Sequence, residues 1–149
     1  MDRILQKKMS ALIEKYSVED IRLALTSIEE AKDERVLTVV VNIGMHSLPE
    51  KILRGDVFFF SEGNVELGPE SVTDTIKLLT KRALRFLRGK IWNKVYVIPS
   101  GHPLLVSMAT LIIYRVTRVN PTIVYYVNGE YLEANLDVRL EAVKTNALK

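Results

Sequence analysis

The run Val36–Ile43 constrains the fold more than any other segment, because it is the strongest strand signal in the chain and shows no alternation of polar and apolar residues. Such a run suits a strand that is covered on both faces, as in a parallel sheet. Gly44 ends the run, and Ser47 with Glu50 three residues later fits a capping box, the pattern that opens a helix. We therefore expect a buried parallel strand followed by a short helix over 48–53.

A second junction of the same kind follows Val95–Ile98, an apolar run that predicts another buried strand. The turn Pro99–His102 ends this strand. Pro103 then suits the first turn of a helix, where its missing N–H costs no hydrogen bond. The helix predicted over 104–118 is apolar nearly all round, which indicates deep burial or cover by a partner.

The two junctions together predict an anion site. Each carries a serine, a glycine and a histidine. A turn from strand to helix leaves backbone N–H groups free at the positive end of the helix dipole, although many such turns only change the direction of the chain. Ligands of open α/β sheets bind beyond the carboxyl ends of the strands, where the winding direction reverses. If the two strands are neighbours, Ser47 and Ser100 therefore face one crevice.

The remaining elements complete an α/β domain over 35–149. They are expected as short strands at 57–60 and 65–67 across a Gly-Asn turn, a helix over 71–88 capped by Ser71 with Asp74, and a strand at 123–127. Asn128-Gly129 then predicts a terminal β-hairpin whose last strand runs antiparallel at an edge. This order favours a mostly parallel sheet with right-handed crossovers and helices on both faces.

Residues 1–34 are expected to form a separate N-terminal helical pair. One apolar stripe is predicted on each helix, formed by Ile4, Leu5, Met9, Leu12 and Tyr16 on the first and by Val18, Ile21, Leu25 and Ile28 on the second. Ser17 to Asp20 look like the cap that opens the second helix. We expect this pair to serve packing or dimerisation, because the acid-rich second helix fits a phosphate backbone poorly.

Charge is distributed unevenly along the chain, whose formal net charge is +3. No Asp or Glu occurs between Thr75 and Gly129, an interval that holds nine basic residues. A region of one sign steers anionic partners toward it. For Arg82, Arg85 and Arg88 we favour a solvated helix face near a helix C-terminus, where the dipole stabilises cations.

Several classes of chemistry are disfavoured. The chain has no cysteine, which excludes disulfides and thiolate metal sites, and its two histidines lack metal-binding spacing, so we expect no metal or cofactor. The glycine fingerprint of dinucleotide enzymes, the phosphate loop and the nucleophile elbow of hydrolases are missing. No export signal or membrane-spanning segment is evident, which favours a cytoplasmic protein without a membrane partner.

His46 and His102 each lie beside one of the two turns. Two interpretations stay open. Both imidazoles approach a phosphodiester, as hydrogen-bond donors or as general acid/base groups, or they are two unrelated loop residues.

The segments 42–47, 98–104 and 124–130 resemble the CARF family, the CRISPR-associated Rossmann-fold sensors of cyclic oligoadenylate. The resemblance covers about residues 36–136. In that family the second turn commonly reads Thr-Gly-Gly-Thr-Lys-x-Met, whereas this chain has Ser100, Gly101 and His102 and lacks both the second glycine and the lysine.

The resemblance implies a Rossmann-like homodimer that holds a cyclic oligoadenylate, or another anionic nucleotide, across its two-fold axis in CRISPR antiviral signalling. Candidate ligand-binding residues are Gly44, Met45, Ser47, Pro99, Ser100, Gly101 and His102. Some family members cleave the ring without metal, and His46, His102 and Ser47 are the candidates for that role. Two alternatives stay open. The first is a non-enzymatic interaction or scaffold protein with a Rossmann-like fold. The second is a DNA-associated regulator that uses the first two helices, although the acid-rich second helix makes DNA an unfavourable partner.

Overall fold

The N-terminal helical pair forms a unit of its own. A computed structural model describes residues 3–33, 35–44, 46–135 and 137–147, without the side chains of 27 and 29–33. The chain divides into two units, 1–34 and 35–149. The first unit holds α1 (Arg3–Lys15) and α2 (Val18–Asp33). Ser17 donates from its hydroxyl to the Asp20 carboxylate at 2.6 Å, and the Asp20 N–H donates back to the Ser17 hydroxyl at 3.1 Å. This capping box confirms the predicted start of the second helix.

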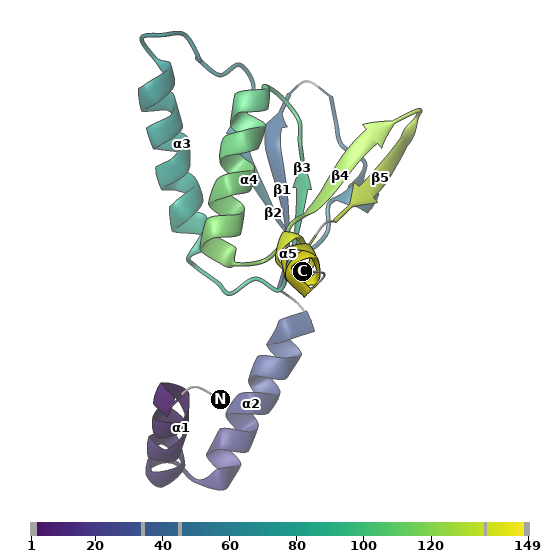
Figure 1. Ribbon diagram of the computed structural model, residues 1–149. Coiled ribbons are helices and arrows are strands. Elements are labelled where there is room, and N and C mark those ends of the chain that lie inside the picture. The colour runs from purple at the N-terminus through teal and green to yellow at the C-terminus, as the bar shows by residue number, and fades with distance from the viewer. Residues whose placement is uncertain (1–2, 34, 45, 136, 148–149) are drawn as a thin grey trace. The chain divides into compact units, whose positions relative to one another are not determined.

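The second unit is built on a five-stranded sheet (Figure 1). The strands are β1 (Val36–Ile43), β2 (Asp56–Glu62), β3 (Lys94–Ile98), β4 (Thr122–Val127) and β5 (Glu130–Ala134), in the order β2-β1-β3-β4-β5. All neighbours pair in parallel except β4 and β5. At the hairpin, Asn128 and Gly129 both have positive φ, of 50° and 86°, as the tight turn predicted there requires. The α/β fold, the mostly parallel sheet and the antiparallel edge strand are therefore confirmed.

The two longest helices of this unit cover one face of the sheet. α3 (Val72–Leu87) packs against α4 (Pro103–Thr117), and both lie in front of the strands in Figure 1. Beneath them is the larger apolar core, to which β1, β2 and β3 contribute Val39, Phe60 and Val97, each at most 1% exposed. α5 (Val138–Ala147) follows β5 and buries no residue. No helix in the described ranges is long and apolar enough to cross a membrane.

The opposite face carries a single 3₁₀ helix, η1 (Glu50–Ile52), so the prediction of a helix over 48–53 was wrong in type and length. Its N-cap is Pro49, with no side-chain hydrogen bond, and Ser47 does not form the predicted capping box. A proline disfavours the helical conformation for the residue before it, and Pro49 follows Leu48, the first residue of the predicted helix. Pro49 is itself extended, with a ψ of 135°. Ile52 seals a second core on this face with Tyr96 and Val124.

The predicted strand over 65–67 is absent, because β2 extends to Glu62 as the parallel partner of β1. Gly63 has a φ of +61° and donates its N–H to Ile43 O at 2.8 Å, which directs the chain away from the sheet. Val65 and Leu67 instead pack, half-buried, against the core beneath α3 and α4. Their apolar character therefore serves packing and not strand pairing.

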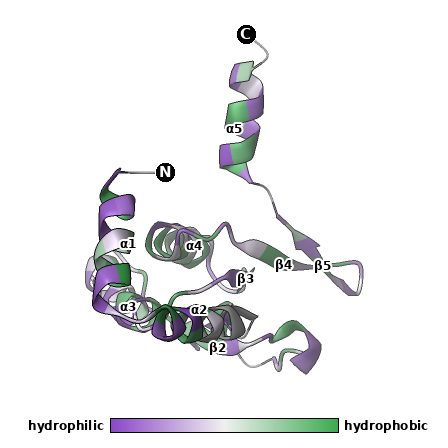
Figure 2. Cartoon of the chain, turned by 90° about the horizontal axis from the view of Figure 1, so that it is seen from below, coloured by the Kyte–Doolittle hydropathy of each residue, from purple (hydrophilic) through white to green (hydrophobic). Residues whose placement is uncertain are grey.

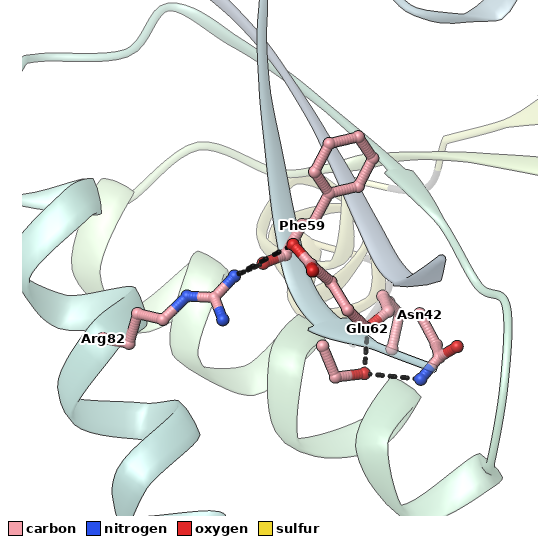
Figure 3. Close-up of polar contacts among 6 residues, drawn as sticks. Asn42, Phe59, Glu62 and Arg82 are labelled. Carbon is pink, nitrogen blue, oxygen red and sulfur yellow. Dashed lines mark hydrogen bonds and ion pairs between the residues drawn. The ribbon is translucent and has the colours of Figure 1, made fainter. Parts of the chain in front are cut away.

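Arg82 is exposed, as predicted, but it also makes contacts that the sequence did not predict. It reaches from α3 to the edge strand β2, where its guanidinium donates to the Phe59 carbonyl and lies 4.0 Å from the Glu62 carboxylate (Figure 3). The same guanidinium lies 5.5 Å from the centroid of the Phe58 ring. Satisfying an outward carbonyl and placing a charge on the edge both hinder pairing of β2 with another chain.

Candidate functional site

The carboxyl ends of β1 and β3 lie side by side, which meets the condition on which the predicted crevice depended. The two strands pair in parallel, with Val36 opposite Lys94 and Val40 opposite Ile98. From β1 the chain moves to β2 on one side, and from β3 it moves to β4 on the other. The winding direction therefore reverses between β1 and β3, and this is the position where open α/β sheets bind their ligands.

Ser100 joins these two strand ends. Its hydroxyl donates to Asn42 O at 2.6 Å and accepts from the Asn42 N–H at 3.0 Å. These two bonds extend the pairing of β1 with β3 beyond the last backbone pair, Val40 and Ile98. Because its hydroxyl already donates and accepts within the protein, Ser100 holds the rim of the site in place more readily than it binds a phosphate.

Asn42 is the residue of this edge that sequence reasoning missed. Its side-chain amide donates to Ser61 Oγ at 2.9 Å (Figure 3) and to Gly63 O at 3.0 Å. Ser61 Oγ in turn donates to Val41 O at 2.7 Å. Together with the bonds to Ser100, this network ties the ends of β2, β1 and β3 to one another. The available signal was the single amide side chain near the end of an otherwise apolar run.

Gly101 follows Ser100 in the left-handed region, with a φ of +86°. A Cβ atom at this position would lie 2.6 Å from the Asn42 Cβ. Both the backbone conformation and the close approach of the two loops therefore require glycine here.

His102 is the N-cap of α4. Its Nδ1 accepts a hydrogen bond from the Leu104 N–H at 3.1 Å, and Pro103 contributes no N–H. The start of α4 therefore offers an anion fewer free donors than the sequence predicted. A neutral imidazole that accepts at Nδ1 carries its proton on Nε2, so His102 presents one N–H donor on an exposed side chain. Within the described part of the chain, the backbone N–H groups of Gly101 and His102 have no acceptor.

The first turn is more open. Gly44 has no atom within 4 Å of where a Cβ would lie, and His46 and Ser47 are exposed. Met45, a predicted ligand-binding residue, lies outside the described residues. Pro99 is half-buried at the end of β3. Thus the structure brings the strand ends together, whereas no contact among the described residues joins His46 to His102.

Most of the positive charge lies away from this edge. Arg85 and Arg88 are at the end of α3, and Arg115 and Arg118 are at the end of α4, where both helices return to the amino ends of the strands. The acid-free interval therefore does not concentrate its charge at the candidate site. Among the described residues, no group of three or more His, Cys, Asp or Glu side chains could hold a metal ion.

Shifted pKa values occur on the second face of the sheet, around Tyr96. Arg54 forms an ion pair with Glu133 of β5, which is the main reason that the pKa of Arg54 is raised, and its guanidinium lies 4.5 Å from the centroid of the Tyr96 ring. Burial, the largest single influence, raises the pKa of Tyr96, but the hydrogen bonds and charges of Lys94 and Arg54 together lower it below its ordinary value. This cluster ties the β1–β2 connection to the hairpin and does not reach the carboxyl edge.

Replacing Ser100 with alanine is expected to lower the free energy of unfolding of the 35–149 unit by about 1–2 kcal/mol, because two hydrogen bonds to Asn42 are lost from a part-buried position. Ser47→Ala is the matched control. Ser47 is exposed, and such a substitution changes stability by at most about 0.5 kcal/mol. Urea unfolding followed by the fluorescence of Trp92, the single tryptophan, measures both. Equal effects of the two substitutions would contradict the positioning role of Ser100.

The chain was compared with protein-family models, with curated proteins and with solved structures, and none of the three comparisons found a match.

Proposed function

We propose that the 35–149 unit is a binding module for an anionic nucleotide, held at the carboxyl edge of the sheet between β1 and β3. The observation that carries the proposal is the junction of Ser100 with Asn42, which holds two loops together at the point where the winding of the sheet reverses. The specific ligand that we propose is a cyclic oligoadenylate, on the resemblance of the two turns and the hairpin to the CARF family.

Each residue of the edge has a distinct role in this proposal. The backbone N–H groups of Gly101 and His102 and the Nε2–H of His102 donate to phosphate oxygens. Ser47 adds a hydroxyl from the first turn, where the space beside Gly44 leaves room for a ligand. Asn42 and Ser100 do not touch the ligand but hold the two loops at a constant separation, which preorganises the donors.

A homodimer and a place in CRISPR antiviral signalling belong to the same proposal. A ring of identical nucleotides has rotational symmetry, so two copies of one site can bind it across a two-fold axis. The absence of cysteine and the nature of the ligand both fit the cytoplasm.

Binding is better supported than cleavage of the ring. Cleavage without metal requires a base and an acid near one phosphodiester. One nitrogen of His102 is committed to capping α4, and no described contact brings His46 next to it. We therefore assign His46, Ser47 and His102 to ligand recognition.

Calorimetry with cyclic tetra-adenylate and cyclic hexa-adenylate tests the proposal, with linear tetra-adenylate as the control ligand. One ring is expected to bind with a Kd in the micromolar range or tighter and the linear form more weakly. His102→Asn keeps an N-cap acceptor for α4 but removes the Nε2–H, and the amide N–H2 of the shorter Asn side chain does not reach the position of that donor. Loss of a hydrogen bond to a charged group costs about 1.5–3 kcal/mol, so this variant is expected to weaken binding about tenfold or more.

The outcomes separate the candidate functions. No heat from either ring at micromolar protein would reject the nucleotide proposal. Unchanged behaviour of His102→Asn in every binding assay would favour the interaction or scaffold alternative. Cleavage is measured directly by incubating the protein with each cyclic adenylate and a chelator and separating the products by chromatography. If the parent forms a linear product and His46→Ala does not, our assignment of His46 to recognition is reversed.

A further inference from the structure

Helices α1 and α2 leave their apolar side chains uncovered. Ten large apolar residues of the pair are between 46% and 77% exposed, and α1 buries no residue at all. Hydrophobic and hydrophilic residues alternate along α1 (Figure 2). Short helices are marginally stable in water by themselves, and packing of an amphipathic face supplies most of their stability in proteins. The described contacts of this unit do not supply that packing.

The apolar residues are ordered along both helices. Leu5, Met9 and Leu12 on α1 and Tyr16 directly after it are spaced by four, three and four residues, and Val18, Ile21, Leu25 and Ile28 on α2 are spaced by three, four and three. This alternation is the heptad pattern of helices that pack lengthwise in a bundle. Between the helices runs an apolar groove lined by Leu12, Ile21, Leu25 and Ile28, among others. Two apolar seams beside an unfilled groove are half of a four-helix arrangement.

The charges of the two helices identify the occupant of the groove. α1 carries four basic residues and one acidic residue, a net charge of +3, and α2 carries five acidic and two basic residues, a net charge of −3. In a two-fold dimer with α1 of one copy against α2 of the other, the same contact occurs twice. Each contact then joins helices of opposite net charge, which favours this arrangement over one that pairs α1 with α1 and α2 with α2.

We infer that residues 1–34 form a dimerisation unit, in which the helical pairs of two copies of this chain close a four-helix bundle. The second copy is complementary in both respects, because it supplies the apolar seams that fill the groove and the opposite charge for each helix. An anionic membrane surface would attract α1, with its net charge of +3, but repel α2, with its net charge of −3, whereas the second copy is complementary to both helices. The inference stands apart from nucleotide binding and concerns the 149-residue chain without ligand.

A charge swap tests the inference by sedimentation equilibrium of the whole 149-residue chain. One variant carries Lys8→Glu and Lys15→Glu, which makes α1 net negative, and the other carries Glu29→Lys and Glu30→Lys, which makes α2 net positive. Each variant alone is expected to have a dimer dissociation constant about tenfold or more above that of the parent, because like charges then face each other. An equimolar mixture of the two is expected to regain parental affinity, because both contacts of the mixed dimer are again complementary. Lys77→Glu with Lys81→Glu on α3 makes the same change in charge outside the unit and is expected to leave the dissociation constant unchanged.

A matched pair of leucines tests the apolar contact independently. Leu25 lines the groove and is 56% exposed, whereas Leu23 on the same helix is 61% exposed and does not line it. Leu25→Gln is expected to weaken the dimer about tenfold or more and Leu23→Gln to leave it unchanged, with circular dichroism confirming that both keep their helices. A monomeric parent, a mixture of the charge variants that fails to recover, or a monomer that binds anionic vesicles would each overturn the inference.

Discussion

Replacing Gly55 with alanine is expected to lower the free energy of unfolding of the 35–149 unit by about 4 kcal/mol, through two separate effects. Gly55 has a φ of +65°, and a residue with a Cβ atom loses about 1–2 kcal/mol in that left-handed conformation. The new Cβ would also lie 2.1 Å from Val36 O and 2.6 Å from the Val36 carbonyl carbon. Val36 pairs with Lys94 of β3, so relief of the clash moves the start of a central strand, and overpacking of this kind costs about 1–3 kcal/mol.

The control for this prediction is Gly63→Ala. Gly63 has nearly the same φ, +61°, but no atom lies within 4 Å of where its Cβ would be. Only the conformational cost applies, so a loss of about 1–2 kcal/mol is expected. Urea unfolding followed by Trp92 fluorescence compares the two, because Trp92 is buried in the same unit. Equal destabilisation by the two alanines would show that the space beside Val36 does not matter.

Replacing Gly101 with alanine is expected to lower the free energy of unfolding by about 3 kcal/mol and to weaken nucleotide binding at least tenfold. The φ of +86° opposes a side chain, and the Cβ atom would lie 2.6 Å from the Asn42 Cβ. Displacing Asn42 strains its hydrogen bonds to Ser61, Gly63 and Ser100. The substitution therefore disturbs the three strand ends that hold the proposed site.

Gly129→Ala separates the effect of conformation from that of contact. Gly129 has the same φ of +86° but open space around the position of its Cβ, so a loss of about 1–2 kcal/mol and unchanged nucleotide binding are expected. The measurements are urea unfolding and calorimetry with the cyclic adenylates. Binding that stays at parental strength in Gly101→Ala would remove the loop after β3 from the site.

Elements with a strong local signal were predicted well from the sequence. The apolar runs of β1 and β3, the Asn128-Gly129 turn and the cap at Ser17 all formed as expected. For the turn and the cap the determining interactions lie within a few residues, such as a side-chain oxygen that accepts from a nearby N–H or a turn that requires positive φ, and for the two strands the local apolar run is itself the signal. Neighbouring residues alone are enough to favour these structures.

Elements whose structure depends on distant partners were predicted less well. The segment after Gly44 has the residues of a capping box, but it forms one 3₁₀ turn that packs Ile52 against Tyr96 and Val124 of other strands. Arg82 has a helical sequence neighbourhood typical of a solvated cation, and only the approach of α3 to the edge of β2 gives it a carbonyl acceptor. The roles of Ser100 and His102 within the site likewise depend on what their polar atoms already bond.

By itself, the sequence determined that this chain alternates strands and helices, that two glycine-containing turns follow its most apolar strands, and that a helical pair precedes them. Only the tertiary structure decided that these turns lie at one edge, that Asn42 and Ser100 lock them together, and that most of the basic residues lie elsewhere. The physical reason is that apolar periodicity and turn chemistry act over a few residues, whereas strand order and hydrogen-bond saturation depend on atoms that are brought together from positions 58 residues apart in the chain.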